Sequence, residues 1–288
     1  MTTQHHRTHD QSPTLVMGAA GNVGRLVLDG LLVRGLPVRA SMRRPRPGQT
    51  PPGVEVCTAD LADPASLVPA FDGMQQVFLY ARFDGVHAVV EAARAAGIRR
   101  VVLLSSGSIV HPSSAGNAIT EEHREVEQAF AGHPDLLVVP VRPLVLATNA
   151  LAWSRSIRAD RRVALYRPEA LTAPVHERDV ADVAVAALLG EDGTSAMLTG
   201  PDRLSQRDQV AAIAAALGEE VAVDELTRSA ALAHLGRFMP PVEVEAVLQF
   251  LDDAADGAFP ATGTVERVLG RPATPYGVWA RDHVEDFR

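Results

Sequence analysis

The stretch that decides the fold is Leu15-Val16-Met17-Gly18-Ala19-Ala20-Gly21-Asn22-Val23-Gly24, followed by Arg25-Leu26-Val27-Leu28-Asp29-Gly30-Leu31-Leu32. A short apolar strand meets a glycine turn and leaves it as an amphipathic helix, the setting in which a Gly-x-x-Gly-x-x-Gly pattern cradles a dinucleotide pyrophosphate. We expect Gly18 to allow the tight turn, Gly21 to let the main chain approach the phosphates, and Gly24 to let the helix pack on the strand. A glycine-rich turn without a ligand is the alternative. The turn predicts cofactor contacts at Gly18, Ala20, Gly21, Asn22, Val23 and Gly24.

Two arginines follow the second predicted strand, residues 38–42. An acid about 20 residues past the glycines would hold the ribose 2′-hydroxyl of NAD, whereas an arginine there accommodates the 2′-phosphate of NADP. This chain has no acid there, but it has Arg43 and Arg44, and a guanidinium suits phosphate and can stack on adenine. We therefore expect NADP(H) to be preferred over NAD(H), with Arg43 as the first phosphate ligand and Arg44 as the second. An arginine-rich surface turn is the alternative.

The composition excludes several classes of protein. All 27 basic residues are arginines, and the lack of lysine excludes Schiff-base chemistry, a phosphate-loop lysine and a catalytic Tyr-x-x-x-Lys pair. A net charge of −8 with no clustered basic stripe argues against a nucleic-acid partner. No apolar run is long enough to span a membrane. The single cysteine, Cys57, excludes an internal disulfide and a Cys-x-x-Cys metal site, and it fits a cytoplasmic location.

Strand-like and helix-like stretches alternate along the chain, which is typical of a parallel sheet with helices on both faces. We predict a Rossmann-type doubly wound α/β fold with a small, mostly helical C-terminal substrate lobe. Residues 1–12 are expected to be a flexible tail, whose histidines lack partners of fixed geometry, so no metal site is predicted. Residues 13–200 would form the dinucleotide-binding domain, with 144–174 partly in the lobe, and 201–288 would form the lobe. Further strands are predicted at 38–42, 54–59, 76–81, 100–104 and 136–143, and helices at 64 onward, 85–96, 120–131, 180–189, 205–217, 227–235 and 241–253.

Several segments resemble the NmrA-like branch of the atypical short-chain dehydrogenase/reductases, in this order along the chain: Val16 to Gly24, Val38 to Arg43, Ala92-Ala93-Arg94-Ala95-Ala96-Gly97-Ile98, Leu103-Leu104-Ser105-Ser106, His123-Arg124-Glu125-Val126-Glu127, Val141-Arg142-Pro143, Asp179-Val180-Ala181-Asp182-Val183-Ala184, Leu198-Thr199-Gly200-Pro201 and Gly270-Arg271-Pro272. The resemblance covers nearly the whole chain from Pro13. It implies a Rossmann-type core, and a family that contains both NAD(P)H-dependent reductases and proteins that sense the cofactor without chemistry.

The resemblance also places candidate site residues. Where redox-active short-chain dehydrogenases have their tyrosine and lysine, this chain has His123 and Glu127, one helical turn apart. His123 could donate or take a proton, and Glu127 could orient the ring and stabilise its charged form, unless the two are simply an exposed helix pair. Further expected cofactor contacts are Asp60, Leu61, Tyr80, Ala81, Arg82 and Ser105, with Tyr80, Ala81 and Arg82 beside the nicotinamide ribose. Expected substrate contacts are Ser106, His123, Asn149, Trp153 and His176, of which Ser106 is also a candidate catalytic hydroxyl.

The function that these residues favour is NADPH-dependent reduction of a small apolar carbonyl, enone or quinone metabolite by hydride transfer. A non-catalytic NADP(H)-sensing protein is the alternative that the missing Tyr-Lys pair favours, and a non-redox isomerase or cyclase is a third. His176 could equally be a structural histidine, Asn149 a loop cap, and Trp153 part of the lobe core. The expected partner is a small-molecule substrate, and the chain is expected to be a monomer or a homodimer.

Overall fold

The computed structural model describes residues 12–81 and 84–288, and its centre is a parallel sheet. Within these residues the sheet has seven strands in the order β3-β2-β1-β4-β5-β6-β9. The order reverses beside β1, because the chain leaves β3 at one edge and crosses back to β4, as in Rossmann-type sheets. The strands are β1 (Thr14–Val16), β2 (Val38–Met42), β3 (Glu55–Thr58), β4 (Gln76–Tyr80), β5 (Arg100–Leu104), β6 (Leu137–Pro143) and β9 (Met197–Leu198).

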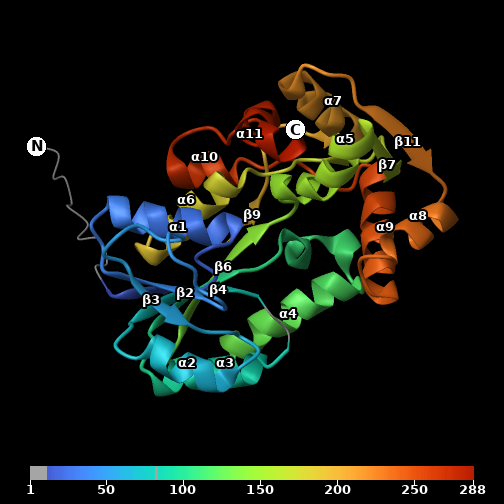
Figure 1. Ribbon diagram of the computed structural model, residues 1–288. Helices are drawn as coiled ribbons and strands as arrows, with labels where there is room; N and C mark the ends of the chain where they lie inside the picture. Colours follow the sequence, from blue (N-terminus) through green and yellow to red (C-terminus); the bar gives the residue numbers. More distant parts are fainter. Residues whose placement is uncertain (1–11, 82–83) are drawn as a thin grey trace, which may run out of the picture.

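Helices cover both faces of this sheet, so the predicted doubly wound α/β fold is confirmed (Figure 1). Val101 and Val102 of β5 are both buried but belong to clusters on opposite faces, because successive side chains of a strand point in opposite directions. Strand β5 is therefore apolar on both sides rather than alternating. The first face carries α1 (Asn22–Val33), α6 (Glu177–Leu188) and α10 (Thr264–Leu269), and the second carries α2 (Pro64–Phe71), α3 (Val86–Ala95) and α4 (Ala118–Ala131).

Local capping explains where helices α2 and α4 begin. Asp63 caps α2 through its side chain, which accepts from the N–H of Ala65, and Pro64 is the first helical residue, as the sequence predicts. Helix α4 begins at Ala118, two residues earlier than predicted. The reason is that Asn117 accepts from the N–H of Thr120 at 3.3 Å and so caps the helix. The starts of α2 and α4 thus follow from single polar side chains.

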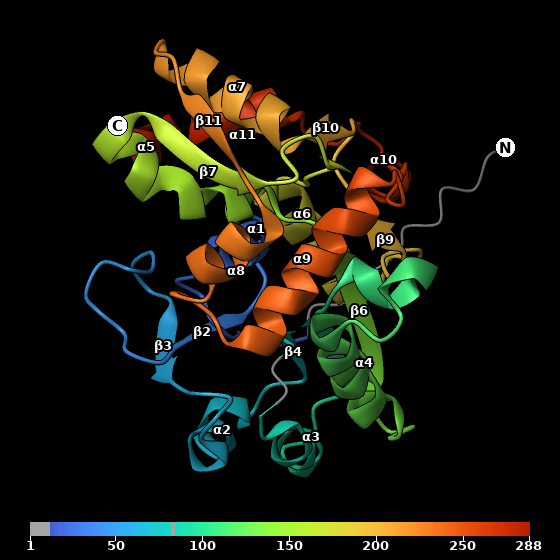
Figure 2. The ribbon, with the colours of Figure 1, turned by 90° about the vertical axis from the view of Figure 1, so that its right-hand side faces the viewer.

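A second group of elements stands apart from the main sheet and forms the C-terminal lobe (Figure 2). It contains two strand pairs that the sequence did not reveal, parallel β7 with β11 and antiparallel β8 with β10. Arg162 and Asp224 form an ion pair at 2.5 Å across the first of them. The elements are η3 (Ala147–Trp153), α5 (Ser154–Asp160), β7 (Arg162–Tyr166), β8 (Leu171–Thr172), β10 (Leu204–Ser205), α7 (Gln206–Leu217), β11 (Ala222–Leu226), α8 (Arg228–Leu235), α9 (Pro241–Ala255), α11 (Tyr276–Asp282) and η4 (Val284–Phe287).

The C-terminal residues do not all lie in this lobe. Helix α10 packs against α6, and its Val265 belongs to the core on the first face of the sheet. The division into domains at residue 200 stays a prediction. Over the described ranges, 12–81 and 84–288, no helix combines the length and the apolar character needed to cross a bilayer.

Candidate cofactor and active site

A cleft of about 1160 Å³ runs along the carboxyl ends of the central strands, where doubly wound sheets bind their ligands. It collects most of the residues that the sequence analysis assigned to the cofactor, together with His123. Gly24 is not part of the lining, and Arg82 lies outside the described residues. The cleft is lined by Met17, Gly18, Ala20, Gly21, Asn22, Val23, Met42, Arg43, Arg44, Arg46, Gln49, Ala59, Asp60, Leu61, Tyr80, Ala81, Leu104, Ser105, His123, Pro143, Leu146 and Thr148.

The glycine turn has the geometry of a phosphate cradle. Gly18 has φ +63°, a conformation that favours glycine. A Cβ on Gly24 would lie 2.3 Å from the carbonyl oxygen of Gly18, so only glycine lets helix α1 start so close to β1. The amides of Asn22 and Val23, in the first turn of α1, have no hydrogen-bond partner in the described part of the chain. The turn therefore fits a dinucleotide, because unpaired amides at a helix start attract phosphate.

The end of the cleft beside β2 is positively charged. Arg43 and Arg44 follow β2 and are exposed, as is Arg46, which the sequence analysis did not single out. Among the described residues, none of these three guanidiniums forms an ion pair with a carboxylate. The carboxylate of Asp60 faces the same cleft but accepts from the N–H of Ala62 at 3.0 Å. The signal for Arg46 was present in the Arg-Arg-Pro-Arg spacing, since all three arginines lie on one short loop.

The other end of the cleft combines two polar groups with apolar walls. Ser105, at the end of β5, is buried, and its hydroxyl oxygen has no partner in the described structure. His123 of α4 is joined through Nδ1 to the carbonyl oxygen of Ile119, 2.8 Å away. A carbonyl only accepts, so Nδ1 carries a hydrogen and the neutral ring has its lone pair on Nε2. His123 can therefore give up a proton at Nε2 only in its imidazolium form.

The expected pairing of His123 with Glu127 is wrong. Both carboxylate oxygens of Glu127 accept from Arg142 of β6, at 2.9 and 2.5 Å, in a partly buried bidentate ion pair. A guanidinium with two parallel donors binds a carboxylate more strongly than one imidazole does. Ser106 also makes a local contact, because its hydroxyl caps η1 (Gly107–Val110) and lies 2.8 Å from that of Ser108. Ser106 is not part of the cleft lining, whereas Ser105 is.

Two predicted substrate contacts lie away from the cleft. Asn149 is exposed on η3, and the neighbouring Thr148 lines the cleft instead. Trp153, at the end of η3, packs against the lobe core that contains Ile157 and Trp279. Trp153 thus serves the lobe core, which was the alternative interpretation of that residue, whereas Leu146, in the same apolar stretch, lines the cleft.

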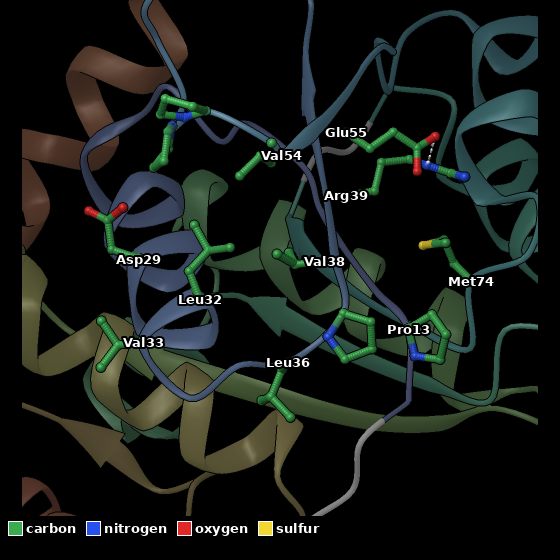
Figure 3. Close-up of a pocket in the computed structure, with 14 residues that line it drawn as sticks. Pro13, Asp29, Leu32, Val33, Leu36, Val38, Arg39, Val54, Glu55 and Met74 are labelled. Atoms are coloured by element: carbon green, nitrogen blue, oxygen red, sulfur yellow. Dashed lines mark ion pairs between the residues drawn. The ribbon is translucent and has the colours of Figure 1, made fainter.

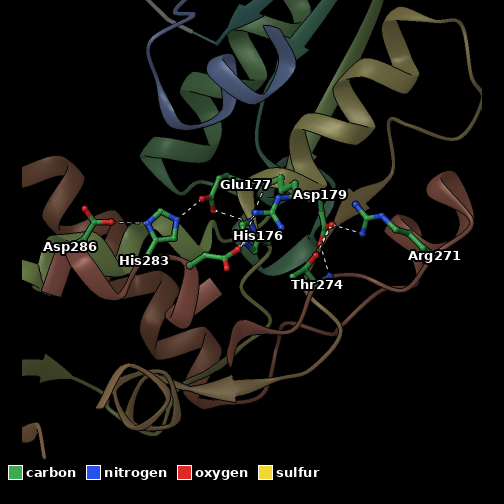
Figure 4. Close-up of polar contacts among 9 residues, drawn as sticks. His176, Glu177, Asp179, Arg271, Thr274, His283 and Asp286 are labelled. Atoms are coloured by element: carbon green, nitrogen blue, oxygen red, sulfur yellow. Dashed lines mark hydrogen bonds and ion pairs between the residues drawn. The ribbon is translucent and has the colours of Figure 1, made fainter. Parts of the chain in front are cut away.

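His176 belongs to a buried polar network rather than to the cleft (Figure 4). It caps α6, because its Nδ1 accepts from the N–H of Arg178 at 3.1 Å. Nδ1 is therefore unprotonated and cannot donate to Oε2 of Glu177, 3.3 Å away. His283 holds that carboxylate instead, with Nε2 at 2.6 Å from Oε1 of Glu177 and Nδ1 at 2.8 Å from Asp286. The structural interpretation of His176 is the one that these contacts support.

Ion pairs and hydrogen bonds in the same region connect the segment after α10, which contains Arg271 and Thr274, to α6. Asp179 is fully buried and accepts from Arg271 at 2.7 Å and from the N–H and hydroxyl of Thr274. Arg271 also pairs with Asp182 at 2.5 Å. Two segments that the sequence analysis noted separately, the one around Asp179 and the one around Arg271, are thus a single ion-pair cluster.

We expect the stability of the chain to depend on pH through Glu177 and His283. Burial alone would raise the pKa of Glu177, but the hydrogen bond from His283 lowers it below its usual value of 4.5. Hydrogen bonding to Glu177 raises the pKa of His283 above 6.5 although burial opposes this. The Glu177 contribution is lost as pH falls below 4.5, and the His283 contribution is lost as pH rises through the raised pKa. Urea unfolding should show highest stability between these limits.

The control separates this network from general effects of pH. His283→Ala should lower the free energy of unfolding at about pH 6 by about 3–5 kcal/mol, because it leaves Glu177 buried without its cation, and should flatten the alkaline decline. His87→Ala, at an exposed position of α3, should change neither. An unchanged alkaline decline in His283→Ala would assign the pH dependence to another group.

A second pocket, of about 790 Å³, lies at the amino ends of the strands, opposite the cleft (Figure 3). Pro13, Val38, Glu55 and Met74 line it, and they precede or begin strands β1, β2, β3 and β4. Its charged wall is the Arg39–Glu55 ion pair, at 2.8 Å. The amino ends of parallel strands lack the glycine turn and the helix start, so this pocket is not the cofactor site.

Comparison with known proteins agrees with the geometry of the cleft. Residues 18–191 match a protein family described as NAD(P)H-binding. The chain is 38% identical over 282 residues to (4-alkanoyl-5-oxo-2,5-dihydrofuran-3-yl)methyl phosphate reductase from Streptomyces griseus, covering 95% of this chain and 98% of that protein. It is 29% identical over 286 residues to an NAD(P)H azoreductase from Xenophilus azovorans, covering 95% and 98%.

A solved structure with the same fold comes from Escherichia coli. It is an NADPH-dependent quinone oxidoreductase in complex with NADPH, and it superposes with a TM-score of 0.76 over 93% of this chain and 99% of that chain. The sequence identity is 21%, so this likeness shows the fold alone.

Proposed function

Because this chain belongs to the NAD(P)H-binding family and is an oxidoreductase of the NmrA-like, atypical short-chain dehydrogenase/reductase type, we propose that it reduces a conjugated double bond of a small metabolite with NADPH. The observation that carries this proposal is the continuity of the cleft. One cleft joins the arginines after β2, the glycine turn, and the pair of Ser105 and His123. A dinucleotide on the turn would place its nicotinamide toward that pair.

The substrate class is proposed from chemistry that a relative's name describes. The compound reduced by the Streptomyces protein has a ring double bond conjugated to a ring carbonyl and to an alkanoyl group. Of the three classes that the sequence favours, carbonyl, enone and quinone, we therefore favour an enone. The apolar walls at Pro143 and Leu146 suit the hydrocarbon part of such a molecule.

The residues of the cleft can assist the reaction at two atoms. NADPH, when bound, supplies a hydride, and in an enone the hydride adds to the β-carbon while the electron pair of the double bond moves toward the carbonyl oxygen. The unpartnered hydroxyl of Ser105 can donate a hydrogen bond to that oxygen. His123, as an imidazolium, can donate the proton that the α-carbon or the oxygen then takes. Atoms and charge balance, because one hydride and one proton saturate one double bond.

A panel of acceptors tests the proposal. Consumption of NADPH is followed by absorbance with butenolides, with and without a phosphate ester, and with ketones, quinones and azo dyes. We expect the butenolides or other enones to be reduced fastest. Tight binding of NADPH without consumption by any acceptor would contradict the proposal and favour the non-catalytic sensor.

We expect the Arg43→Ala variant to lose most of the preference for NADPH over NADH. A charge-assisted contact to the 2′-phosphate is worth about 1.5–3 kcal/mol, so the affinity ratio should fall by about tenfold or more. Calorimetric titration with each cofactor measures the ratio. Arg99→Ala, at an exposed position before β5 and far from the cleft, is the matched control and should keep it. Equal affinity of the unaltered chain for both cofactors would contradict the assignment of Arg43.

A further inference from the structure

Tyr80, the last residue of β4, lies directly beneath the glycine turn. Its Oη accepts from the N–H of Gly24 at 2.8 Å. Its ring stands edge-on to Phe78, with centroids 5.5 Å apart, and a Cβ on Gly18 would lie only 2.7 Å from the ring. Tyr80 was predicted to lie beside the nicotinamide ribose, but its hydroxyl lies at the start of α1.

This contact changes which amides of α1 can meet an anion. The first four amides of a helix have no partner within it. The amide of Arg25 bonds to the carbonyl of Gly21 at 3.0 Å, and that of Gly24 is taken by Tyr80. The amides of Asn22 and Val23 are left. A side chain therefore intercepts one of the three donors that this helix start would otherwise offer.

The hydroxyl that takes the amide of Gly24 keeps a donor of its own. A phenolic oxygen can accept and donate at once. Accepting from Gly24 leaves the hydrogen of Tyr80 Oη free to point elsewhere, and no acceptor for it occurs in the described part of the chain. Tyr80 also lines the cleft, and a Cβ on Gly21 would lie 3.1 Å from Oη. The hydroxyl is thus next to the surface that the phosphates must approach.

We propose that Tyr80 is a ligand of the dinucleotide pyrophosphate, donating its O–H to a phosphate oxygen while it accepts from the amide of Gly24. The hydroxyl thereby bridges the amide of Gly24, the third of α1, and the anion. The phosphate gains one donor in addition to the backbone amides of Asn22 and Val23. This proposal rests on the cofactor-binding part of the proposed function and is independent of hydride transfer.

The protonation of Tyr80 agrees with this role. Burial raises the pKa of Tyr80 above its usual value of 10, although the bond from Gly24 lowers it. The hydroxyl therefore keeps its hydrogen at neutral pH. A neutral phenol is a donor to phosphate, whereas a phenolate would repel it.

Tyr80→Phe tests the proposal, because it removes the hydroxyl and keeps the ring that packs against Gly18 and Phe78. Calorimetry should show the affinities for NADPH and NADH both falling by about 10- to 100-fold, the usual worth of a hydrogen bond to a charged group. The affinity for adenosine 2′-monophosphate, which lacks a pyrophosphate, should not change. Tyr166→Phe is the matched control, because the Tyr166 hydroxyl bonds to Asp252 at 2.9 Å in the lobe. It should leave all three affinities unchanged.

A second measurement on the unsubstituted sequence keeps the proposal testable if Tyr80→Phe does not fold. The chain has three tyrosines, so labelling with meta-fluorotyrosine gives few fluorine NMR signals. The Tyr80 signal should shift when ADP is added and should not shift with adenosine 2′-monophosphate.

Three results would overturn the proposal. If Tyr80→Phe binds NADPH as tightly as the parent chain or more tightly, the phenol merely blocks the helix start and is not a ligand. An equal loss of affinity for adenosine 2′-monophosphate would show a general distortion of the turn. A parent chain that binds neither dinucleotide would overturn the proposed function as well, which distinguishes the two failures.

Discussion

Gly21→Val is expected to abolish measurable binding of both NADPH and NADH while the chain stays folded. Gly21 is the N-cap of α1, with φ −80° and ψ 167°, an extended conformation that valine adopts without strain. Its Cβ would lie 3.1 Å from Oη of Tyr80 and 3.2 Å from the carbonyl oxygen of Gly18, and the two methyl groups would reach farther. They would occupy the space in which the phosphates must meet the amides of Asn22 and Val23.

Calorimetry with each cofactor and circular dichroism of the variant measure binding and folding separately. Gly132→Val is the matched control, since Gly132 is exposed after α4, has φ −66°, and has no atom closer than 3.9 Å to an added Cβ. It should bind both cofactors normally. Retained binding in Gly21→Val, with a native dichroism spectrum, would show that the turn is structural only.

His123→Ala is expected to lower turnover by about 10²–10⁴-fold, the usual worth of general acid catalysis, with a smaller effect on the apparent affinity for substrate. The hydrogen bond from Nδ1 to Ile119 makes the imidazolium the only form that can donate from Nε2. Initial rates at saturating NADPH and varied substrate concentration measure both changes.

The rival account is that water supplies the proton and the bound cofactor alone accounts for the rate. Under it, His123→Ala would keep the parent turnover. His87→Ala is the control for the loss of any histidine, because His87 is exposed on α3 and is not part of the cleft. It should not change the rate.

The parts of the site that could be predicted are those encoded in short stretches. The turn from Gly18 to Gly24 follows from glycine spacing between a strand and a helix, and Arg43 follows from the distance between that turn and the end of the next strand. Ser105 follows from its place at the end of an apolar strand. Each of these residues lines the cleft or shapes its turn, because the carboxyl ends of parallel strands meet at one edge.

The partners of polar side chains could not be predicted in the same way. Glu127 has His123 one turn away, yet it binds Arg142 of the neighbouring strand. Helical spacing shows which residues share a face, but it does not show which side chains of the adjoining strand contact that face. His176 was expected to face the pocket from the returning strand before α6, but its place in a buried network depends on Asp282 and His283 at the end of α11.

The sequence by itself determined the Rossmann-type sheet, the order of its first strands and helices, and the glycine turn with the arginines behind it. These signals are local, because strand and helix periods and capping residues act between near neighbours. The tertiary structure alone decided that the Tyr80 hydroxyl meets Gly24, 56 positions earlier, and that Glu177 meets His283, 106 positions later. It also decided the pairing of β7 with β11. Such contacts depend on how whole elements pack, and the residues that make them carry no local pattern.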